Sequence, residues 1–394
     1  MKAVFSDIHE WLLEAARVMR RQFSLVFSDM GVMLFFFFLP VAYPVVYSLI
    51  YNTEVTRDMP VAVVDNCRTA LSREFVRHAD ATEAIKICGY AADLNEARRW
   101  MNEHRCYGVL EIPADYSARL GRGEQAMARF YCDMGLLYRY RTFLSSLTEL
   151  QMATCTELRQ TGLNLLGVSS SAMGESVETQ AFFLGDTQQG FASFIIPGIV
   201  VLILQQSMLL GIAMLDGASN ERRRRNRGYD PVAVRDASPS ASCIGKALCY
   251  VAIYLPLTLF ILHYIPELFA YPHQGDAADY LLFIFPMLLA TAFLGISLQG
   301  LMRERESAFI VVVFTSVVFL FLSGLTWPRY AMNDFYLMLG NLVPATWGIE
   351  GFIRINTNGG SLADQATPYH WLWGLTALFF VTAYLTTRRR SVTD

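Results

Sequence analysis

The stretch Gly31–Tyr51 reads GVMLFFFFLPVAYPVVYSLIY and contains no charged side chain. A helix needs about 20 mostly apolar residues to cross a bilayer, so this stretch predicts a membrane-spanning helix. A polar segment follows, from Asn52 to about Gln188, and five further apolar stretches come after it. These five are Phe191–Leu215, Cys243–Ile265, Tyr280–Leu301, Ala308–Trp327 and Trp371–Thr386. The order predicts an α-helical polytopic membrane protein with six transmembrane helices and a small domain inserted after the first.

The composition agrees with a membrane protein. Hydrophobic residues make up 54% of the 394 residues, and the mean hydropathy is +0.32. The formal net charge of −3 gives no reason to expect nucleic-acid binding. The first apolar stretch is too long and begins too late for a cleavable signal peptide, so we expect an uncleaved anchor.

Arginine and lysine cluster at alternate ends of the apolar stretches. The clustered residues are Arg17, Arg20, Arg21, Arg222–Arg225, Arg227, Arg235, Lys246, Arg303, Arg305 and Arg388–Arg390. Basic residues near the ends of spans favour the cytoplasmic side. Both termini are therefore predicted to be cytoplasmic, and residues 52–188 to be extracytoplasmic.

The first and last segments are predicted to lie in the cytoplasm. Apolar residues spaced by three or four make one stripe along Asp7–Phe27, so residues 1–29 are interpreted as an amphipathic helix at the membrane interface. The alternative is a linker helix that packs on the bundle. The first transmembrane helix follows at 30–51, and residues 388–394 form the tail.

The segment 52–188 alternates strand-like and helix-like patterns, which predicts a small α/β domain with a helical extension. Strands are expected at Met59–Asp65, Ile85–Tyr90, Tyr107–Pro113 and Ala126–Asp133. Helices are expected at Arg68–Ala79, Asp93–Glu103, Asp115–Leu120 and Leu137–Thr161.

Catalytic and metal-binding patterns are missing from the sequence. Five of the seven cysteines lie in the segment 52–188, namely Cys67, Cys88, Cys106, Cys132 and Cys155. None shows Cys-x-x-Cys spacing, so no metal site is expected, and their pairing as disulfides or persistence as free thiols stays open. Without a Gly-x-Ser-x-Gly or His-Glu-x-x-His motif, no catalytic residue is expected.

Three stretches carry motifs that occur together in one family. MPVAVVDNCRTALSREFVRHAD and YGVLEIPADYSARLGRGE form the first. Ser219–Tyr250 carries Glu221, Arg222, Gly228, Pro239, Gly245 and Lys246, and Arg303–Ile355 carries Ser323-Gly324, Trp327-Pro328, Met332, Pro344 and Glu350-Gly351. Together they resemble the permease subunits of type-2 ABC exporters, in the branch with a large extracytoplasmic domain between the first and second transmembrane helices. Arg223, Tyr229 and Asn333 depart from the family pattern.

The resemblance implies an efflux permease of the bacterial cytoplasmic (inner) membrane. Energy would come from separate ABC ATPase subunits, which bind ATP and Mg, and this chain would bind no cofactor. The absence of a Gly-x-x-x-x-Gly-Lys-Ser/Thr loop agrees with that division. A second permease copy or a sister permease would complete the pathway, and a periplasmic adaptor protein is a further expected partner.

The resemblance also implies where the ATPase docks. The loop 216–242 would form a short cytoplasmic coupling helix, with Ser219 as its cap and Gly228 at its end. Glu221, Arg222, Gly228 and Lys246 are the expected ATPase-coupling residues. Alternatively, Arg222–Arg225 only fix the topology and bind anionic membrane lipid.

The region 189–387 holds the remaining five transmembrane helices. Their near lack of ionisable residues argues against a proton- or sodium-driven carrier. Gln205, Gln206 and Gln299 are the candidate substrate-pathway residues, and the many phenylalanines suit a lipophilic or drug-like compound.

The outer segment 327–369 is expected to be re-entrant. It is too interrupted by proline and glycine to cross a membrane. Pro328, Pro344 and Glu350 are its candidate outer-gate residues. Glu350 and Arg354 are four residues apart, so they are predicted to pair on one helical face.

Three other functions stay open at this point. A receptor or sensor with a ligand-binding extracytoplasmic domain would need a cytoplasmic signalling domain, and the cytoplasmic segments are short. An integral-membrane enzyme would need a polar cluster near one interface. An ABC-type subunit that transmits force without transport has the same sequence features as an exporter.

Overall fold

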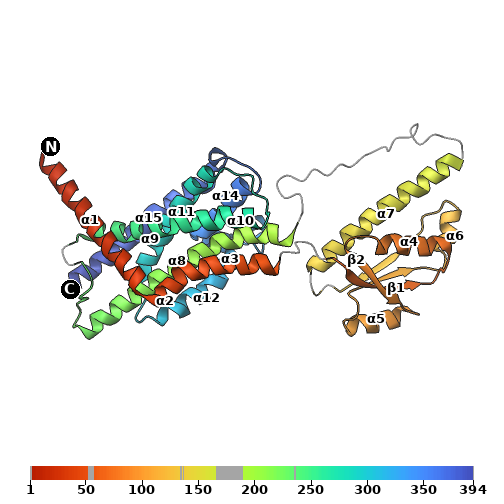
Figure 1. The fold of residues 1–394 in the computed structure, drawn as a ribbon, viewed down its shortest axis with the longest axis horizontal. Helices are drawn as coiled ribbons and strands as arrows, with labels where there is room; N and C mark the ends of the chain where they lie inside the picture. The colour runs from red at the N-terminus through yellow and green to blue at the C-terminus, as the bar shows by residue number, and fades with distance from the viewer. Residues whose placement is uncertain are drawn as a thin grey trace. The chain divides into compact units, whose positions relative to one another are not determined.

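The computed structural model describes residues 2–51, 57–133, 135, 137–165, 190–234 and 237–393 (Figure 1). The chain forms two compact units. Val55–Ala181 makes one unit, and Met1–Glu54 together with Phe182–Asp394 makes the other. The predicted domain end at residue 188 lies outside the described residues.

The unit Val55–Ala181 is built on a four-stranded sheet in the order β2-β1-β3-β4. Its strands are β1 (Met59–Asp65), β2 (Ile85–Tyr90), β3 (Gly108–Ile112) and β4 (Arg129–Cys132). β1 pairs in parallel with β2 and β3, and β3 pairs antiparallel with β4. The helices are α4 (Ala70–Asp80), α5 (Leu94–Asn102), α6 (Tyr116–Gly121) and α7 (Leu137–Leu165).

Helices cover both faces of this sheet. Val61 and Val63 of β1 pack in a cluster with residues of α4, α6 and α7. Ala62 and Val64 point to the opposite face and pack with Ala97 of α5. Because both faces are buried, the central strand is a continuous apolar run rather than an alternating one. This arrangement confirms the small α/β fold predicted for the segment.

The other unit begins with α1 (Lys2–Ser28), which contains the predicted amphipathic helix. α2 (Met30–Met33), a wider π-helical turn at Leu34–Phe38 and α3 (Leu39–Ile50) then form the first apolar segment. Pro40 is the second residue after the π turn and has no N–H to donate within the helix, which accounts for the irregular turn.

The helix α8 (Phe191–Arg225) is the central element of the bundle. In its most apolar window 83% of the residues are buried, against 22% for Met30–Ile50. α8 contacts α3, α11, α12 and α14. It continues without a break through Ser219 to Arg225, so the prediction of a separate short coupling helix capped by Ser219 is wrong. α8 therefore extends beyond the predicted apolar stretch by almost three turns.

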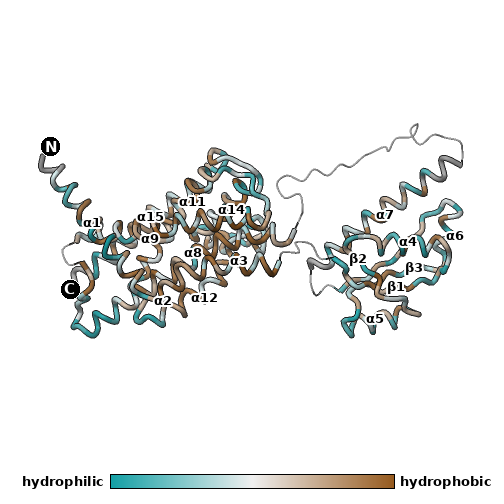
Figure 2. Tube along the Cα trace, viewed as in Figure 1, coloured by the Kyte–Doolittle hydropathy of each residue, from teal (hydrophilic) through white to brown (hydrophobic). Residues whose placement is uncertain are grey.

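The remaining elements complete this helical unit. They are α9 (Pro239–Leu259), a π turn (Phe260–Tyr264), α10 (Ile265–Leu268), α11 (Ala277–Ser297), a 3-10 turn (Leu298–Gly300), α12 (Ser307–Leu322), α13 (Asp334–Asn341), α14 (Pro344–Asn356) and α15 (Ala366–Thr393). Figure 2 shows hydrophobic residues along α3, α8, α11 and α12.

Four helical segments of the described residues are long and apolar enough to cross a membrane. They are Met30–Ile50, Phe191–Arg225, Pro239–Leu268 and Ala277–Gly300. α12 is apolar but shorter, with 16 residues, and α15 is the sixth predicted element. A multi-pass helical membrane protein is therefore confirmed, while the count of six spans stays a prediction.

Candidate functional site

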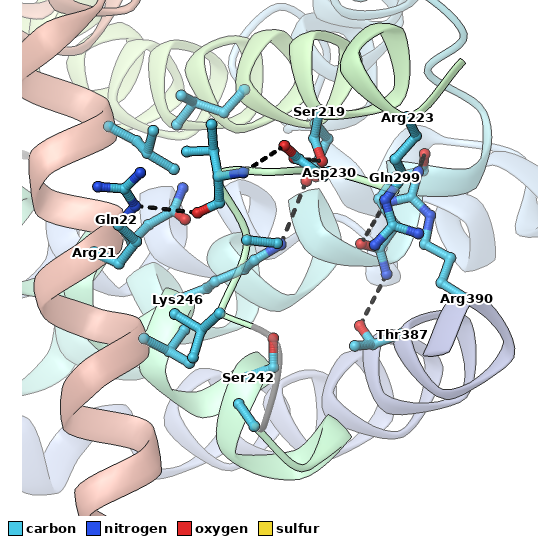
Figure 3. A pocket seen from close by; sticks show the side chains of 18 of the residues that line it. Arg21, Gln22, Ser219, Arg223, Asp230, Ser242, Lys246, Gln299, Thr387 and Arg390 are labelled. Carbon is cyan, nitrogen blue, oxygen red and sulfur yellow. Dashed lines mark hydrogen bonds and ion pairs between the residues drawn. The ribbon is translucent and has the colours of Figure 1, made fainter. Parts of the chain in front are cut away.

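The apolar parts of α8, α9, α11 and α15 give way to polar residues around one cavity of about 430 Å³ (Figure 3). We call it the polar-end cavity. Asp216 of α8, Lys246 of α9, Gln299 of the turn after α11 and Arg390 of α15 line it. α1 supplies a further wall through Arg21 and Gln22, among others. Elements from distant parts of the chain therefore meet at this end of the bundle.

A tight turn follows the last residue of α8. The amide of Gly228 donates to the carbonyl of Arg223 at 2.8 Å, and Arg227 and Gly228 have φ values of 53° and 99°. This six-to-one bond with left-handed residues after the helix is a common way to satisfy terminal carbonyls. Gly228 thus lies three residues after the end of α8, and no separate coupling helix ends there.

Asp230 connects this turn to α8 through hydrogen bonds. Its carboxylate accepts bonds from Arg222 Nε and Nη2 at 2.9 and 3.1 Å, from Ser219 Oγ at 2.6 Å and from the Val232 amide at 3.1 Å. Burial alone would raise the pKa of Asp230, but these four bonds hold it below its ordinary value. The carboxylate therefore stays charged at neutral pH, and Ser219 acts as its donor instead of as a helix cap.

The amphipathic helix α1 is attached to the chain on the other side of this turn. Trp11 Nε1 donates to Ser240 Oγ at 3.0 Å, and Glu14 Oε2 accepts from the amide and hydroxyl of Ser238, each at 2.9 Å. Arg21 Nε donates to the carbonyl of Val232 at 3.1 Å. The bonds from Ser238 lower the pKa of Glu14. α1 is therefore bonded both to the turn and to the start of α9.

Lys246 and Asp216 connect α9 to α8. Their Nζ and Oδ1 atoms are 3.7 Å apart, and the side chains are 23% and 5% exposed. An ion pair with this little water is expensive to break on one side only. Lys246 thus helps to hold α9 against α8.

Arg390 joins α15 to the same end of the bundle. Its guanidinium donates to Oε1 and to the carbonyl of Gln299, at 3.0 and 2.8 Å, and to Asn220 Oδ1. Gln299 Nε2 donates in turn to Thr386 and Thr387. Gln299 is therefore part of this polar network, and the sequence did not indicate Arg390 or Asn220 as its partners.

The three glutamines predicted to line a pathway do not all lie at the same depth along the helical bundle. Gln205 is fully buried and its Oε1 accepts the Ala345 amide at 2.6 Å, in the first turn of α14. Asn220, whose Nδ2 donates to the Gln299 carbonyl at 3.0 Å, is 15 residues further along α8. At 1.5 Å per residue this separates Gln205 from the level of Gln299 by roughly 22 Å. Gln206 neighbours Gln205, and its amide atoms have no hydrogen-bond partner among the described residues.

Glu221 lies on the exposed side of the end of α8. It pairs with Arg225 one turn later at 2.8 Å, and Arg224 pairs with Glu304 at 3.2 Å. These surface pairs stabilise little by themselves. Glu221, Arg224 and Arg225 instead present a charged surface next to the turn at Gly228.

Two of the predicted outer-gate residues, Pro344 and Glu350, lie in α14, and Pro328 precedes it in the chain. Glu350 accepts from Arg354 at 2.9 Å, which confirms the predicted pair, and also from Arg329. The guanidinium of Arg329 lies 4.3 Å from the ring centroid of Trp347. Pro344 is the first residue of α14, where a missing N–H costs nothing.

Pro328 precedes the short turn that carries Arg329. The local spacing predicted only Arg354 as a partner of Glu350, because Arg329 is 21 residues away from Glu350. The second partner depends on the fold of the intervening segment.

The described residues contain no cluster of three or more histidine, cysteine, aspartate or glutamate side chains that could hold a metal ion. Cys67, Cys88, Cys106, Cys155, Cys243 and Cys249 are free thiols. The interactions described at the site are ion pairs and hydrogen bonds that join its helices.

The comparisons with known proteins identify the family. A family model described as ABC-2 family transporter protein matches residues 31–385. The comparison with curated proteins gives no match. Because the family model covers most of the chain, this chain belongs to the ABC-2 family of transporter proteins.

Proposed function

We propose that this chain is the membrane-spanning permease subunit of an ATP-driven exporter that moves a lipophilic or drug-like compound out of the cell. Six helices form one half of the substrate pathway, and a second permease copy or a sister permease forms the other half. ATP and Mg²⁺ bind to a separate ABC ATPase, a partner that membership of the family implies. The chain itself is non-catalytic.

In this proposal the polar end of the bundle faces the cytoplasm. Arg222–Arg225, Arg305 and Arg388–Arg390 lie on segments that end there or connect there. An excess of arginine favours the cytoplasmic side of a bilayer. The unit Val55–Ala181 is then extracytoplasmic, and α1 lies at the inner interface.

The observation that carries the proposal is the attachment of one exposed turn to three helices. The turn at 226–234 is bonded to α8 through Asp230 and Arg222 and to α1 through Val232 and Arg21. Further along the chain, Lys246 of α9 pairs with Asp216 of α8. A partner that pushes on this turn would therefore move several helices together, as coupling of ATP hydrolysis to a pathway requires.

The test is the rate of ATP hydrolysis by the complex of this chain with its ATPase in proteoliposomes. Gly228→Ala strains the backbone at a φ of 99°, although no atom lies within 4 Å of the added Cβ. We expect this change to lower the stimulation of ATPase activity by transported compound without preventing membrane insertion. Gly374→Ala is the matched control, since Gly374 also has open space and no positive φ.

Equal stimulation in the Gly228→Ala protein and the unaltered protein would exclude a coupling role for the turn. A fall of the same size in both glycine variants would point to general damage to the bundle instead.

A further inference from the structure

The helix α14 begins inside the bundle. Residues 343–349, which include its whole first turn, are buried, and the Ala345 amide bonds to Gln205 of α8 at 2.6 Å. Gln205 is 14 residues after Phe191, where α8 begins, and 10 residues before Leu215, where its apolar stretch ends. At 1.5 Å per residue these separations are roughly 21 and 15 Å. The N-terminus of α14 therefore lies near the middle of the apolar layer.

A helix that begins at this depth leaves backbone amides that need acceptors. The first N–H groups of a helix have no partner within the helix, and the hydrocarbon layer offers them no water. Val343, the residue before α14, provides no side-chain hydrogen bond, and Pro344 has no N–H. The Thr346 amide donates to the Val343 carbonyl at 3.1 Å. The Ala345 amide takes its acceptor from another part of the chain.

Gln205 supplies this acceptor from 140 residues earlier in the chain. Because a backbone N–H can only donate, the side-chain atom that receives it is the oxygen Oε1. The side chain is fully buried, and its Nε2 group has no hydrogen-bond partner among the described residues. A buried N–H without a partner lowers stability. The oxygen is therefore the part of Gln205 that benefits the fold.

Close packing brings the two helices together at the same place. Figure 1 shows α14 beside α8 and α11, and α14 contacts both. A Cβ atom added at Gly348 would clash with Met287 Sδ and lie 3.2 Å from Val201 Cγ1. Val201 is one helical turn before Gln205, so both lie on the face of α8 that meets α14. Gly348 comes after Ala345, so α14 runs antiparallel to α8, from the middle of the apolar layer toward the end where α8 begins.

We propose that Gln205 is the positioning residue of the segment 327–369. Its side-chain oxygen takes the place of a local N-cap and fixes the buried start of α14 against α8. Trp347 and Glu350 belong to the same helix, so their place relative to α8 depends on this bond. In one respect the inference rests on the proposed function, because it takes this segment to close the outer end of the export pathway. In this role Gln205 does not line that pathway.

The experiment measures amide hydrogen exchange by mass spectrometry in the full-length protein in nanodiscs. Gln205→Met keeps the length of the side chain and removes the acceptor, so exchange of the amides at 345–348 should accelerate about tenfold or more. Gln205→Glu is the rescue variant, since a carboxyl keeps an oxygen at the same reach and suits a helix N-terminus. Gln206→Met is the matched control, because the Gln206 amide atoms have no hydrogen-bond partner among the described residues.

Faster exchange in Gln205→Met, with slow exchange in Gln205→Glu and Gln206→Met, supports the proposal. Equal acceleration in Gln206→Met would indicate general loosening of the bundle and overturn it, as would unchanged exchange in Gln205→Met. The unaltered protein gives a measurement that does not depend on the folding of any variant. Its Ala345 amide should exchange as slowly as the interior of α8, and rapid exchange there would overturn the proposal.

A second readout tests the consequence for the pathway. Proteoliposomes loaded with carboxyfluorescein and kept without ATP should release the dye severalfold faster with Gln205→Met than with Gln205→Glu or Gln206→Met. Equal release from all three would overturn the role of this contact in closing the pathway. Neither measurement uses an ATPase. A failure here is therefore distinct from unchanged ATPase stimulation in Gly228→Ala, which would contradict the proposed function.

Discussion

Arg222 and Asp230 form a paired set of hydrogen bonds across the end of α8, with Nε–Oδ1 and Nη2–Oδ2 distances of 2.9 and 3.1 Å. Asp230 is only 3% exposed, whereas Arg222 is 32% exposed, so the carboxylate is buried beneath its partner. The same carboxylate binds Ser219 and the Val232 amide. One aspartate therefore fixes the conformation of the segment that joins α8 to α9.

Replacement of this carboxylate should loosen the turn. Asp230→Asn keeps the shape but removes the charge that Arg222 requires, and we expect the free energy of unfolding to fall by roughly 1–3 kcal/mol. Thermal unfolding in detergent measures the effect. A double-mutant cycle with Arg222→Gln is the control, since the two changes should not be additive. An unchanged unfolding temperature for Asp230→Asn would show that the pair does not stabilise the turn.

The joint between α8 and α9 gives a second prediction. Asp216→Asn leaves Lys246 without its counter-charge, and removal of one member of a buried pair costs about 3–5 kcal/mol. Asp216→Leu combined with Lys246→Met removes both charges and should be markedly milder than either single change. Unfolding in increasing denaturant compares the variants. If the double variant is as unstable as the single ones, the charge pair is not the source of the loss.

Arg329 and Arg354 both bind the carboxylate of Glu350 in α14, but their substitutions should have different effects on stability. Arg329 bonds to Glu350 and Asn341 and lies over Trp347, and it is 20% exposed, whereas Arg354 is 50% exposed. Arg329→Gln should lower the unfolding temperature clearly, and Arg354→Gln should change it little, because exposed ion pairs contribute about 0–1 kcal/mol. Equal losses in the two variants would contradict this ranking.

A pair of histidines predicts sensitivity to acid. His263 Nδ1 and His273 Nε2 are 2.7 Å apart, and His273 also bonds to Asn356 of α14. Burial lowers the pKa of His273 below 6.5, and the Asn356 bond opposes this only in part. The neutral ring is therefore favoured in the folded protein. Its contribution to stability is present above pH 6.5 and is lost as the pH falls through the lowered pKa.

The measurement is the unfolding temperature as the pH is reduced from neutral to below the lowered pKa of His273. The unaltered protein should lose stability more steeply than His273→Gln, which has no ring to protonate. Parallel curves for the two proteins would exclude His273 as the sensitive group.

Local patterns in the sequence predicted a large part of this fold. β1 and β2 occupy the predicted ranges Met59–Asp65 and Ile85–Tyr90, because short apolar runs between turn residues have few alternatives. The pair of Glu350 and Arg354 could be predicted in the same way, since one helical turn brings the two side chains together.

The contacts of the candidate site depend on the fold itself. Arg390 meets Asn220 across 170 residues and Trp11 meets Ser240 across 229, and no local pattern indicates such partners. The continuation of α8 past Ser219 was missed because serine is a common cap, while here Asp230 returns to bind its hydroxyl.

The central claim is that the surface at the end of α8 binds an ATPase, and co-purification from native membranes tests it most directly. Glu221→Arg with Arg225→Glu exchanges the two charges of this ion pair, keeps opposite charges one helical turn apart and leaves the net charge unchanged. Insertion and unfolding temperature should therefore be preserved. Each ATPase group that faces Glu221 or Arg225 would then meet a side chain of the opposite charge. Recovery of the ATPase should therefore fall about tenfold.

Mass spectrometry of the purified material measures that recovery. The account predicts an ABC ATPase with the unaltered chain and little with the exchanged pair. Recovery of no ATPase with the unaltered chain, or equal recovery with both, would contradict it.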